Sequence, residues 1–419
     1  MSIAKTNWLE FTLFPLFIIN ITTSANTWNI LGLSIGQLFF YIIIIISSYI
    51  IVNTQYKFAA FILVFLSLVF HATNLFLGSF LIDGLKAISL GGIFVLVGGK
   101  IYGENPNLLH QQLTYFFLIS IPFMICQMIG ISSVFMLWNT DYAHSIEVLD
   151  LSEIGTFKFI PVYPTLFIGL DELNYQIGQG RPSGLLNANN ILSIFVLIGI
   201  VINLITAKTV KFRLSDFVVI CILVLTMSFM DFLGTLLVFF YCILFGGRIL
   251  RVKSIKLLII TIAFLSIYYL FFPGLFQANF GESKFLVSTL TRGLDIANAL
   301  GLSGLNDIFF DEVLLIGNAF SEDSSYSQIS LILKSEYLIP LILGILFIGL
   351  FYLKSCKLFR KKRGESTRDF DLFLFCLIFS QFAIPYIEAP SFQFLLGFAL
   401  YPLMQKFWSV KILDNSKFL

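Results

Sequence analysis

Long runs of apolar residues recur along the whole chain, and they constrain the fold more than any other feature. The hydrocarbon core of a bilayer needs about 20 apolar residues per helix, and the chain offers twelve candidate spans. These are residues 9–23, 31–52, 58–77, 84–99, 112–136, 188–206, 214–230, 232–247, 255–272, 330–353, 370–386 and 391–409. Charged residues make up only 12% of the 419 residues, about half the fraction found in soluble domains. The sequence therefore predicts an all-α, polytopic membrane protein in which residues 1–419 form a single integral membrane domain.

Two apolar segments differ in length from a typical membrane-spanning helix. Residues 84–99 form a short span that follows Asp83 and Lys86. Residues 214–247 are too long for one crossing and contain Asp231 and Gly234 near the middle. Because an α-helix rises 1.5 Å per residue, we expect this second region to form two helices of about 25 Å each.

Basic residues concentrate in three short segments, which predict the orientation. The segments are residues 208–213, 248–256 and 354–368, with three, four and seven Lys or Arg residues. Cytoplasmic loops are rich in Lys and Arg, so all three segments are expected inside. The first two flank residues 214–247, which therefore cross the membrane twice. Twelve spans then leave both termini in the cytoplasm.

Two long segments are expected on the outer side. Residues 137–187 hold six acidic and two basic residues, and residues 273–329 hold seven acidic and two basic residues. Long loops are usually either functional or disordered. Both segments contain enough Leu, Ile, Phe and Tyr to pack, which favours a functional role.

The strongest local signal for function closes the first outer loop. Arg181 precedes Gly184, and Asn190 follows at the start of a predicted span. A helix N-terminus carries unpaired N–H groups and positive dipole, so it favours an anion. The Arg181 guanidinium matches phosphate oxygens, and Gly184 permits close backbone approach. Ser183 or Asn187 can cap the helix. The alternative is an interfacial arginine, a Pro-Gly turn and an asparagine cap.

A second signal closes the other outer loop. Gly317 is followed by Asp323 and Tyr326 just before an apolar span, and Asp323 stands at a helix N-cap position. Arg292 lies upstream and is one of two basic residues in this loop. The alternative is a plain helix cap and a surface arginine.

Several classes of function are not supported. The net charge of +2 is too small to indicate nucleic-acid binding, and the three histidines do not have metal-ligand spacing. The five cysteines suggest no disulfide framework. The acidic pairs 171–172, 311–312 and 322–323 could bind a divalent ion, but solvated loop acids are the simpler interpretation, so we expect no metal. No phosphate-cradling loop for ATP is present, and we expect no cofactor. A reaction would draw on an activated substrate already in the membrane.

The chain resembles the O-antigen polymerase and O-antigen ligase family. The shared features are about twelve spans, two long outer loops, and an Arg-x-x-Gly motif followed by asparagines that enter a span. Arg181, Gly184 and Asn190 carry the motif, whereas Ala188 and Asn189 stand where the family more often has Asn-Pro.

The second outer loop separates the two branches of this family. The segment from Gly317 to Tyr326 is similar to the end of the family's second outer loop. Ligases are expected to carry a histidine at about the place of Asp323, and this chain has no histidine after His144. The resemblance therefore favours a polymerase over a ligase.

The resemblance implies a glycosyltransferase with a GT-C-like architecture in the bacterial cytoplasmic membrane. It would join undecaprenyl-diphosphate-linked repeat units of O-antigen, capsule or exopolysaccharide at the outer face. Its partners would be that lipid-linked oligosaccharide, membrane lipid, a chain-length regulator and a flippase, with no nucleic acid. Arg181 and Arg292 would stabilise the departing diphosphate and Asp323 would be the base. The expected substrate-binding residues are Ser183, Gly184, Asn187, Asn190, Gly317 and Tyr326.

Three alternatives remain open at this point. One is an O-antigen ligase-type transferase, and another is a lipid-linked oligosaccharide flippase or other transporter. A transporter usually has polar or charged residues within its spans. The predicted spans here are almost free of charge, which favours chemistry at the outer surface. The third is a non-catalytic membrane scaffold, which would explain neither outer loop.

Overall fold

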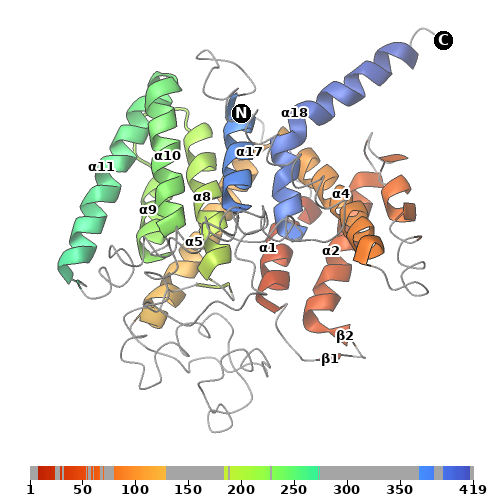
Figure 1. The fold of residues 1–419 in the computed structure, drawn as a ribbon, viewed down its shortest axis with the longest axis horizontal. Helices are drawn as coiled ribbons and strands as arrows, with labels where there is room; N and C mark the ends of the chain where they lie inside the picture. The colour runs from red at the N-terminus through yellow and green to blue at the C-terminus, as the bar shows by residue number, and fades with distance from the viewer. Residues whose placement is uncertain are drawn as a thin grey trace, which may run out of the picture.

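A computed structural model defines the fold (Figure 1). It describes residues 8–23, 29–30, 33–52, 54, 58–59, 61–66, 69, 80–128, 184–186, 189–226, 229–271, 273, 368–381 and 390–415. The predicted span 330–353 and most of 58–77 lie outside the described residues. The same is true of the outer loops 137–187 and 273–329, apart from residues 184–186 and 273.

The described residues are almost entirely helical, as the sequence predicts. The helices are α1 (Trp8–Thr23), α2 (Ile35–Val52), α4 (Phe80–Glu104), α5 (Pro106–Met128), α8 (Asn189–Ile205), α9 (Leu214–Thr226), α10 (Phe229–Phe245), α11 (Arg248–Phe271), α17 (Arg368–Gln381) and α18 (Pro390–Asn415). Two-residue strands β1 (Asn29–Ile30) and β2 (Leu33–Ser34) form one antiparallel ribbon ahead of α2. Pro106 and Pro390 each occupy a first helical position, where a missing N–H costs no hydrogen bond.

Two boundaries differ from the sequence prediction. Helix α4 has 25 residues and contains Asp83 and Lys86, which the prediction placed before a short span. Residues 214–247 do form two helices, but α9 ends at Thr226 and α10 begins at Phe229. Gly234, which the prediction put at the break with Asp231, therefore lies inside α10. Gly234 serves packing there, because a Cβ would come within 3.1 Å of the side chains of Leu197 and Phe379.

In the part of the chain that the structure describes, two helices meet the length and composition of a membrane-crossing helix. They are the Pro106–Ile125 part of α5 and the whole of α11, Arg248–Phe271. Five shorter apolar helices accompany them among the described residues: Trp8–Ile21, Gly36–Val52, Ile191–Ile205, Leu214–Thr226 and Phe232–Phe245.

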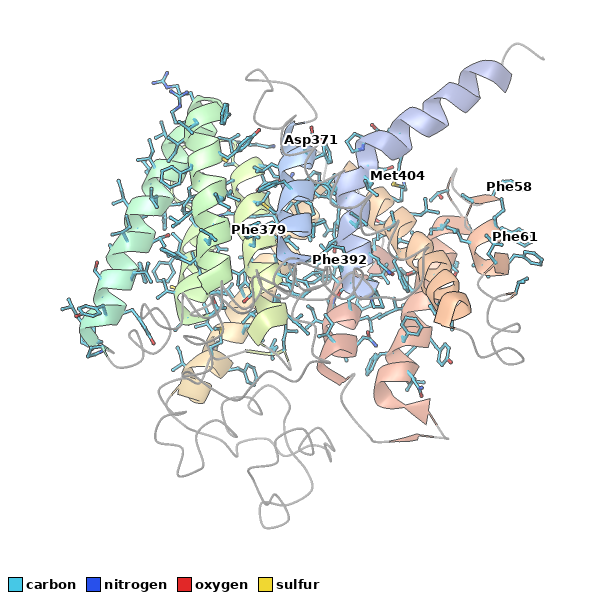
Figure 2. All side chains as sticks on the ribbon, in the orientation of Figure 1. Phe58, Phe61, Asp371, Phe379, Phe392 and Met404 are labelled. Carbon is cyan, nitrogen blue, oxygen red and sulfur yellow. The ribbon has the colours of Figure 1, made fainter. Side chains whose placement is uncertain are left out.

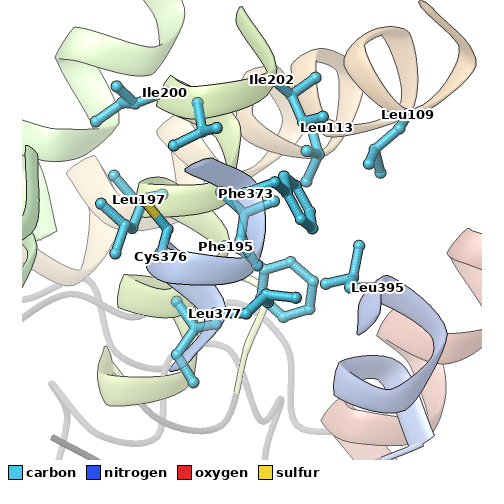
Figure 3. Packing of buried hydrophobic residues seen from close by; sticks show 14 of the residues in the cluster. Leu109, Leu113, Phe195, Leu197, Ile200, Ile202, Phe373, Cys376, Leu377 and Leu395 are labelled. Atoms are coloured by element: carbon cyan, nitrogen blue, oxygen red, sulfur yellow. The ribbon is translucent and has the colours of Figure 1, made fainter. Parts of the chain in front are cut away.

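The helices form a continuous bundle with the C-terminal pair in its centre. Figure 1 shows α17 and α18 in blue, between the green group α8 to α11 and the red to orange group α1, α2 and α4. Helix α17 packs against both α8 and α18, and α18 packs along α4. Figure 3 shows the core at this junction, where Phe195 and Leu197 of α8 meet Phe373, Cys376 and Leu377 of α17.

Helices α4 and α18 pack closely through glycines. A Cβ at Gly98 would meet the backbone carbonyl of Phe394, and one at Gly397 would meet the carbonyl of Val95. Such backbone-to-backbone contact requires glycine and is frequent between membrane helices, where small residues allow close approach.

The outward faces of the helices are apolar. On α11, Ile259 is 60% exposed and Leu270 is 75% exposed. On α2, Ile45 is 67% exposed. Figure 2 shows Phe58 and Phe61 at the edge of the molecule, directed away from the bundle. Large apolar side chains exposed on several helices are typical of a surface that another apolar phase or partner covers.

Candidate functional site

The end of the predicted Arg-x-x-Gly motif packs on helix α5. Gly184 begins a turn over residues 184–186 and has a left-handed φ of 61°. A Cβ on Gly184 would lie 2.9 Å from the Cβ of Ser120 and 3.4 Å from the Cγ of Met124. Leu186 is fully buried in the core. Gly184 is therefore required here both for its φ angle and for its close approach to α5.

Helix α8 begins five residues after Gly184, at Asn189. Asn190 lies in its first turn, as the sequence predicts. This start provides unpaired N–H groups and the positive end of the helix dipole. The remaining predicted site residues lie outside the described residues: Arg181, Ser183, Asn187, Arg292, Gly317, Asp323 and Tyr326.

A buried polar cluster lies at the opposite end of α8, and Asp216 is at its centre. Asp216 is the third residue of α9 and is fully buried. Its carboxylate lies 2.8 Å from Lys253 Nζ, and it accepts a hydrogen bond of 2.6 Å from Asn203 Nδ2. It also accepts a 2.7 Å hydrogen bond from the backbone N–H of Arg213. This last bond is half of a capping box and fixes the start of α9.

Asn203 connects this carboxylate to two further helices. Its Oδ1 accepts a 3.0 Å hydrogen bond from Ser215 Oγ and lies 3.0 Å from His110 Nε2 on α5. Arg213 donates to both the side chain and the backbone carbonyl of Asn203. Because Lys253 lies on α11, this cluster joins α5, α8, α9 and α11.

The cluster stabilises the packing of the helices and is poorly suited to act on a substrate. Burial lowers the pKa of the Arg213 guanidinium, the Asp216 carboxylate opposes the shift, and arginine remains charged. The adjacent cavity, lined partly by His110, Asn203 and Ser215, has room for about one water molecule. Within the described ranges, no group of three His, Cys, Asp or Glu residues could hold a metal ion.

Sequence reasoning missed this cluster. It placed Lys253 among the solvated bases of a loop, whereas α11 already begins at Arg248 and Lys253 is only 2% exposed. Lys253 is tolerated there because the Asp216 carboxylate compensates its charge. A usable signal was present in Asn203, the one polar side chain in residues 194–205 of α8, because polar residues within such helices usually have partners.

The two ends of α8 therefore differ in character. The Gly184 turn lies at the start of α8, and the polar cluster lies at its end. The 17 residues of the helix separate these ends by about 25 Å. Lys256 Nζ, in the third turn of α11, donates a 3.3 Å hydrogen bond to the carbonyl of Val210, so residues 208–213 lie beside the N-terminal part of α11.

The described part of the chain defines a helical bundle with apolar outward faces. No family model, curated protein or solved structure matches the chain. Its function must therefore be inferred from its residues and their geometry.

Proposed function

We propose that this chain is a polytopic protein of the bacterial cytoplasmic membrane that polymerises glycans at the outer face. Its donor would be a repeat unit linked to undecaprenyl diphosphate. The observation that carries the proposal is the left-handed Gly184 turn, packed on α5, which ends the Arg-x-x-Gly motif beside the N-terminus of α8.

The apolar outward faces support the membrane part of the proposal. The Arg248–Phe271 helix is long and apolar enough to cross a bilayer, and only 22% of its apolar window is buried in the bundle. A core helix of a soluble protein would be mostly buried, so lipid is the natural cover for this surface.

The positions of the basic segments support the orientation. Residues 208–213 and the start of α11 lie at one end of the bundle, connected by the bond from Lys256 to Val210. Lys and Arg are enriched on the cytoplasmic side, so this end would face the cytoplasm. The Gly184 turn, at the other end of α8, would then face outward with Arg181.

The proposed reaction needs a cationic site for the leaving group more than it needs an acid. A hydroxyl of the acceptor sugar attacks the anomeric carbon of the donor, and a new C–O bond forms. The bond from that carbon to the diphosphate oxygen breaks, and undecaprenyl diphosphate leaves with the electron pair. Arg181, Arg292 and the start of α8 would stabilise its developing charge. Asp323 would take the proton of the attacking hydroxyl.

Binding of the sugars and the diphosphate would involve the polar residues around these groups. Gly184 and the N-terminal turn of α8, which contains Asn190, are the part of this site with a described backbone. The further proposed contacts are Ser183, Asn187, Gly317 and Tyr326. The diphosphate bond of the donor is already activated, so the reaction requires no nucleotide and no cofactor.

A flippase is the second candidate, and one observation favours it. Asp216 and Lys253 form a buried ion pair, and charged residues buried among membrane helices often mark a transport path. However, Asp216 is the third residue of α9 and Lys253 the sixth of α11, so both lie near helix ends. Transport sites are usually near the middle of the bilayer, which favours the polymerase.

The lipid-linked glycans of a strain lacking this protein test the proposal. A polymerase defect leaves single repeat units on the lipid carrier, exposed on the outer face. Single units held on the cytoplasmic face would instead identify a flippase. Full-length polymer retained on the lipid would identify a ligase.

A further inference from the structure

Two segments separated in the sequence form one basic surface at the end of the bundle that carries the Asp216 cluster. We call this surface the basic-end patch, and it consists of Lys208, Lys211, Arg248, Arg251 and Lys256. Four of these side chains are exposed and Arg251 is half-buried. The bond from Lys256 Nζ to the carbonyl of Val210 holds the two segments together.

Two described carboxylates near this end of the bundle, Asp216 and Glu104, are already paired with other bases. Asp216 is fully buried and is already paired with Lys253. Glu104, on α4, is paired with Lys100 at 2.6 Å. Neither of these carboxylates forms an ion pair with the patch, so an external anion would gain from its positive charge.

The start of α11 adds positive charge to this surface and also favours an anion. A helix N-terminus is the positive end of the dipole, so an acid is favourable there and a base is unfavourable. The first turn of α11 holds no acid and begins with Arg248. Gly247, just before the helix, has open space around it.

Exposed apolar side chains adjoin the patch in the sequence. Phe212 is 47% exposed, Leu214 is 67% exposed and Ile249 is 38% exposed. A free phosphate ion would use only the charges, whereas a phospholipid combines an anionic headgroup with an apolar chain. The neighbourhood of bases and apolar groups therefore fits a lipid better than a soluble anion.

We propose that the basic-end patch binds the headgroups of anionic phospholipids in the leaflet at that end of the bundle. The phosphate would sit between Arg248 and Arg251 at the start of α11, while acyl chains cover the apolar surface beside Phe212 and Leu214. This inference rests on the membrane-spanning part of the proposed function, and it does not depend on the polymerase reaction.

Native mass spectrometry of the purified full chain tests this site. Phosphatidylglycerol and phosphatidylcholine with the same acyl chains are titrated against the protein in detergent. The unaltered chain retains phosphatidylglycerol preferentially. A base near an anionic membrane contributes about fivefold in affinity, so Arg248→Gln or Arg251→Gln each lowers phosphatidylglycerol affinity by about that factor. Arg251→Lys keeps the charge and most of the binding.

Lys100→Gln is the matched control. It removes one positive charge from a lysine that Glu104 already neutralises, and it changes phosphatidylglycerol affinity less than about twofold. An equal loss in this control, or no preference over phosphatidylcholine, would overturn the proposal. Competition by millimolar inorganic phosphate would also overturn it, because the patch would then be a site for a free anion.

The two proposals fail in different ways. If the purified chain selects phosphatidylglycerol but forms no polymer, only the proposed activity is refuted. If the chain forms polymer normally but shows no lipid selectivity, only the proposed lipid site is refuted.

Discussion

The ion pair between Asp216 and Lys253 yields the most quantitative prediction, through Asp216→Asn. Asparagine keeps the size of the side chain but has one acceptor oxygen, so the change removes the charge and one of the bonds from Asn203 and Arg213. Lys253, which is 2% exposed, then loses the opposite charge that lies 2.8 Å away. Leaving one charge of a buried pair without compensation costs about 3–5 kcal/mol. We expect a loss of that size in the free energy of unfolding.

Lys253→Met should lower the free energy of unfolding less than Asp216→Asn does. The reason is that Asp216 still accepts hydrogen bonds from the N–H groups of Asn203 and Arg213. The double variant should be more stable than Asp216→Asn alone, since neither charge is then left unpaired. The assay is reversible unfolding in mixed micelles as the mole fraction of a denaturing detergent rises. Lys100→Met, at an exposed pair with Glu104, serves as the control and should cost less than about 1 kcal/mol.

A double-mutant cycle decides whether the reasoning is correct. Contacting charges should show a coupling energy well above the roughly 0.5 kcal/mol within which distant sites are additive. Additive effects of Asp216→Asn and Lys253→Met would refute the claim that this pair ties α9 to α11.

Three further predictions concern packing and the proposed site. Gly98→Ala should cost about 1–3 kcal/mol because its Cβ would meet the Phe394 carbonyl, whereas Gly247→Ala, in open space, should be nearly neutral in the same unfolding assay. Gly184→Ala should cost about 1–2 kcal/mol from its left-handed φ and should also reduce polymer formation. Arg181→Lys should lower polymerisation of purified lipid-linked units by about 10²–10³-fold, almost as Arg181→Ala does. A Lys variant close to unaltered activity would instead make Arg181 an interfacial anchor.

Much of the helical architecture could be predicted from the sequence, because the length of each apolar segment indicates where a helix can form. Predicted residues 9–23 and 188–206 correspond closely to α1 (Trp8–Thr23) and α8 (Asn189–Ile205). Polar residues were the source of the errors. Asp83 and Lys86 were treated as a boundary, but they lie within α4, which extends over 25 residues.

The sequence does not show which charged residues pair with each other in the folded chain. Asp216 and Lys253 are 37 positions apart, and each resembles a solvated residue beside a basic loop. Only the packing of α9 on α11 shows that they compensate each other. In the predicted site, Gly184 has a left-handed φ and approaches α5, whereas the sequence-based prediction assigned its close approach to a bound anion. Ser120 and Met124, which support it, have no sequence signal because their proximity depends on how α5 and α8 pack.

The central claim is tested most directly by the purified chain in vesicles with lipid-linked repeat units as the only glycan. The account predicts a ladder of lipid-linked polymers, formed without nucleotide sugar or ATP, together with release of undecaprenyl diphosphate. The ladder should be absent with Arg181→Ala at the same protein amount. Unchanged single units with the unaltered chain, or a ladder that persists in Arg181→Ala, would contradict the proposed polymerase and its site.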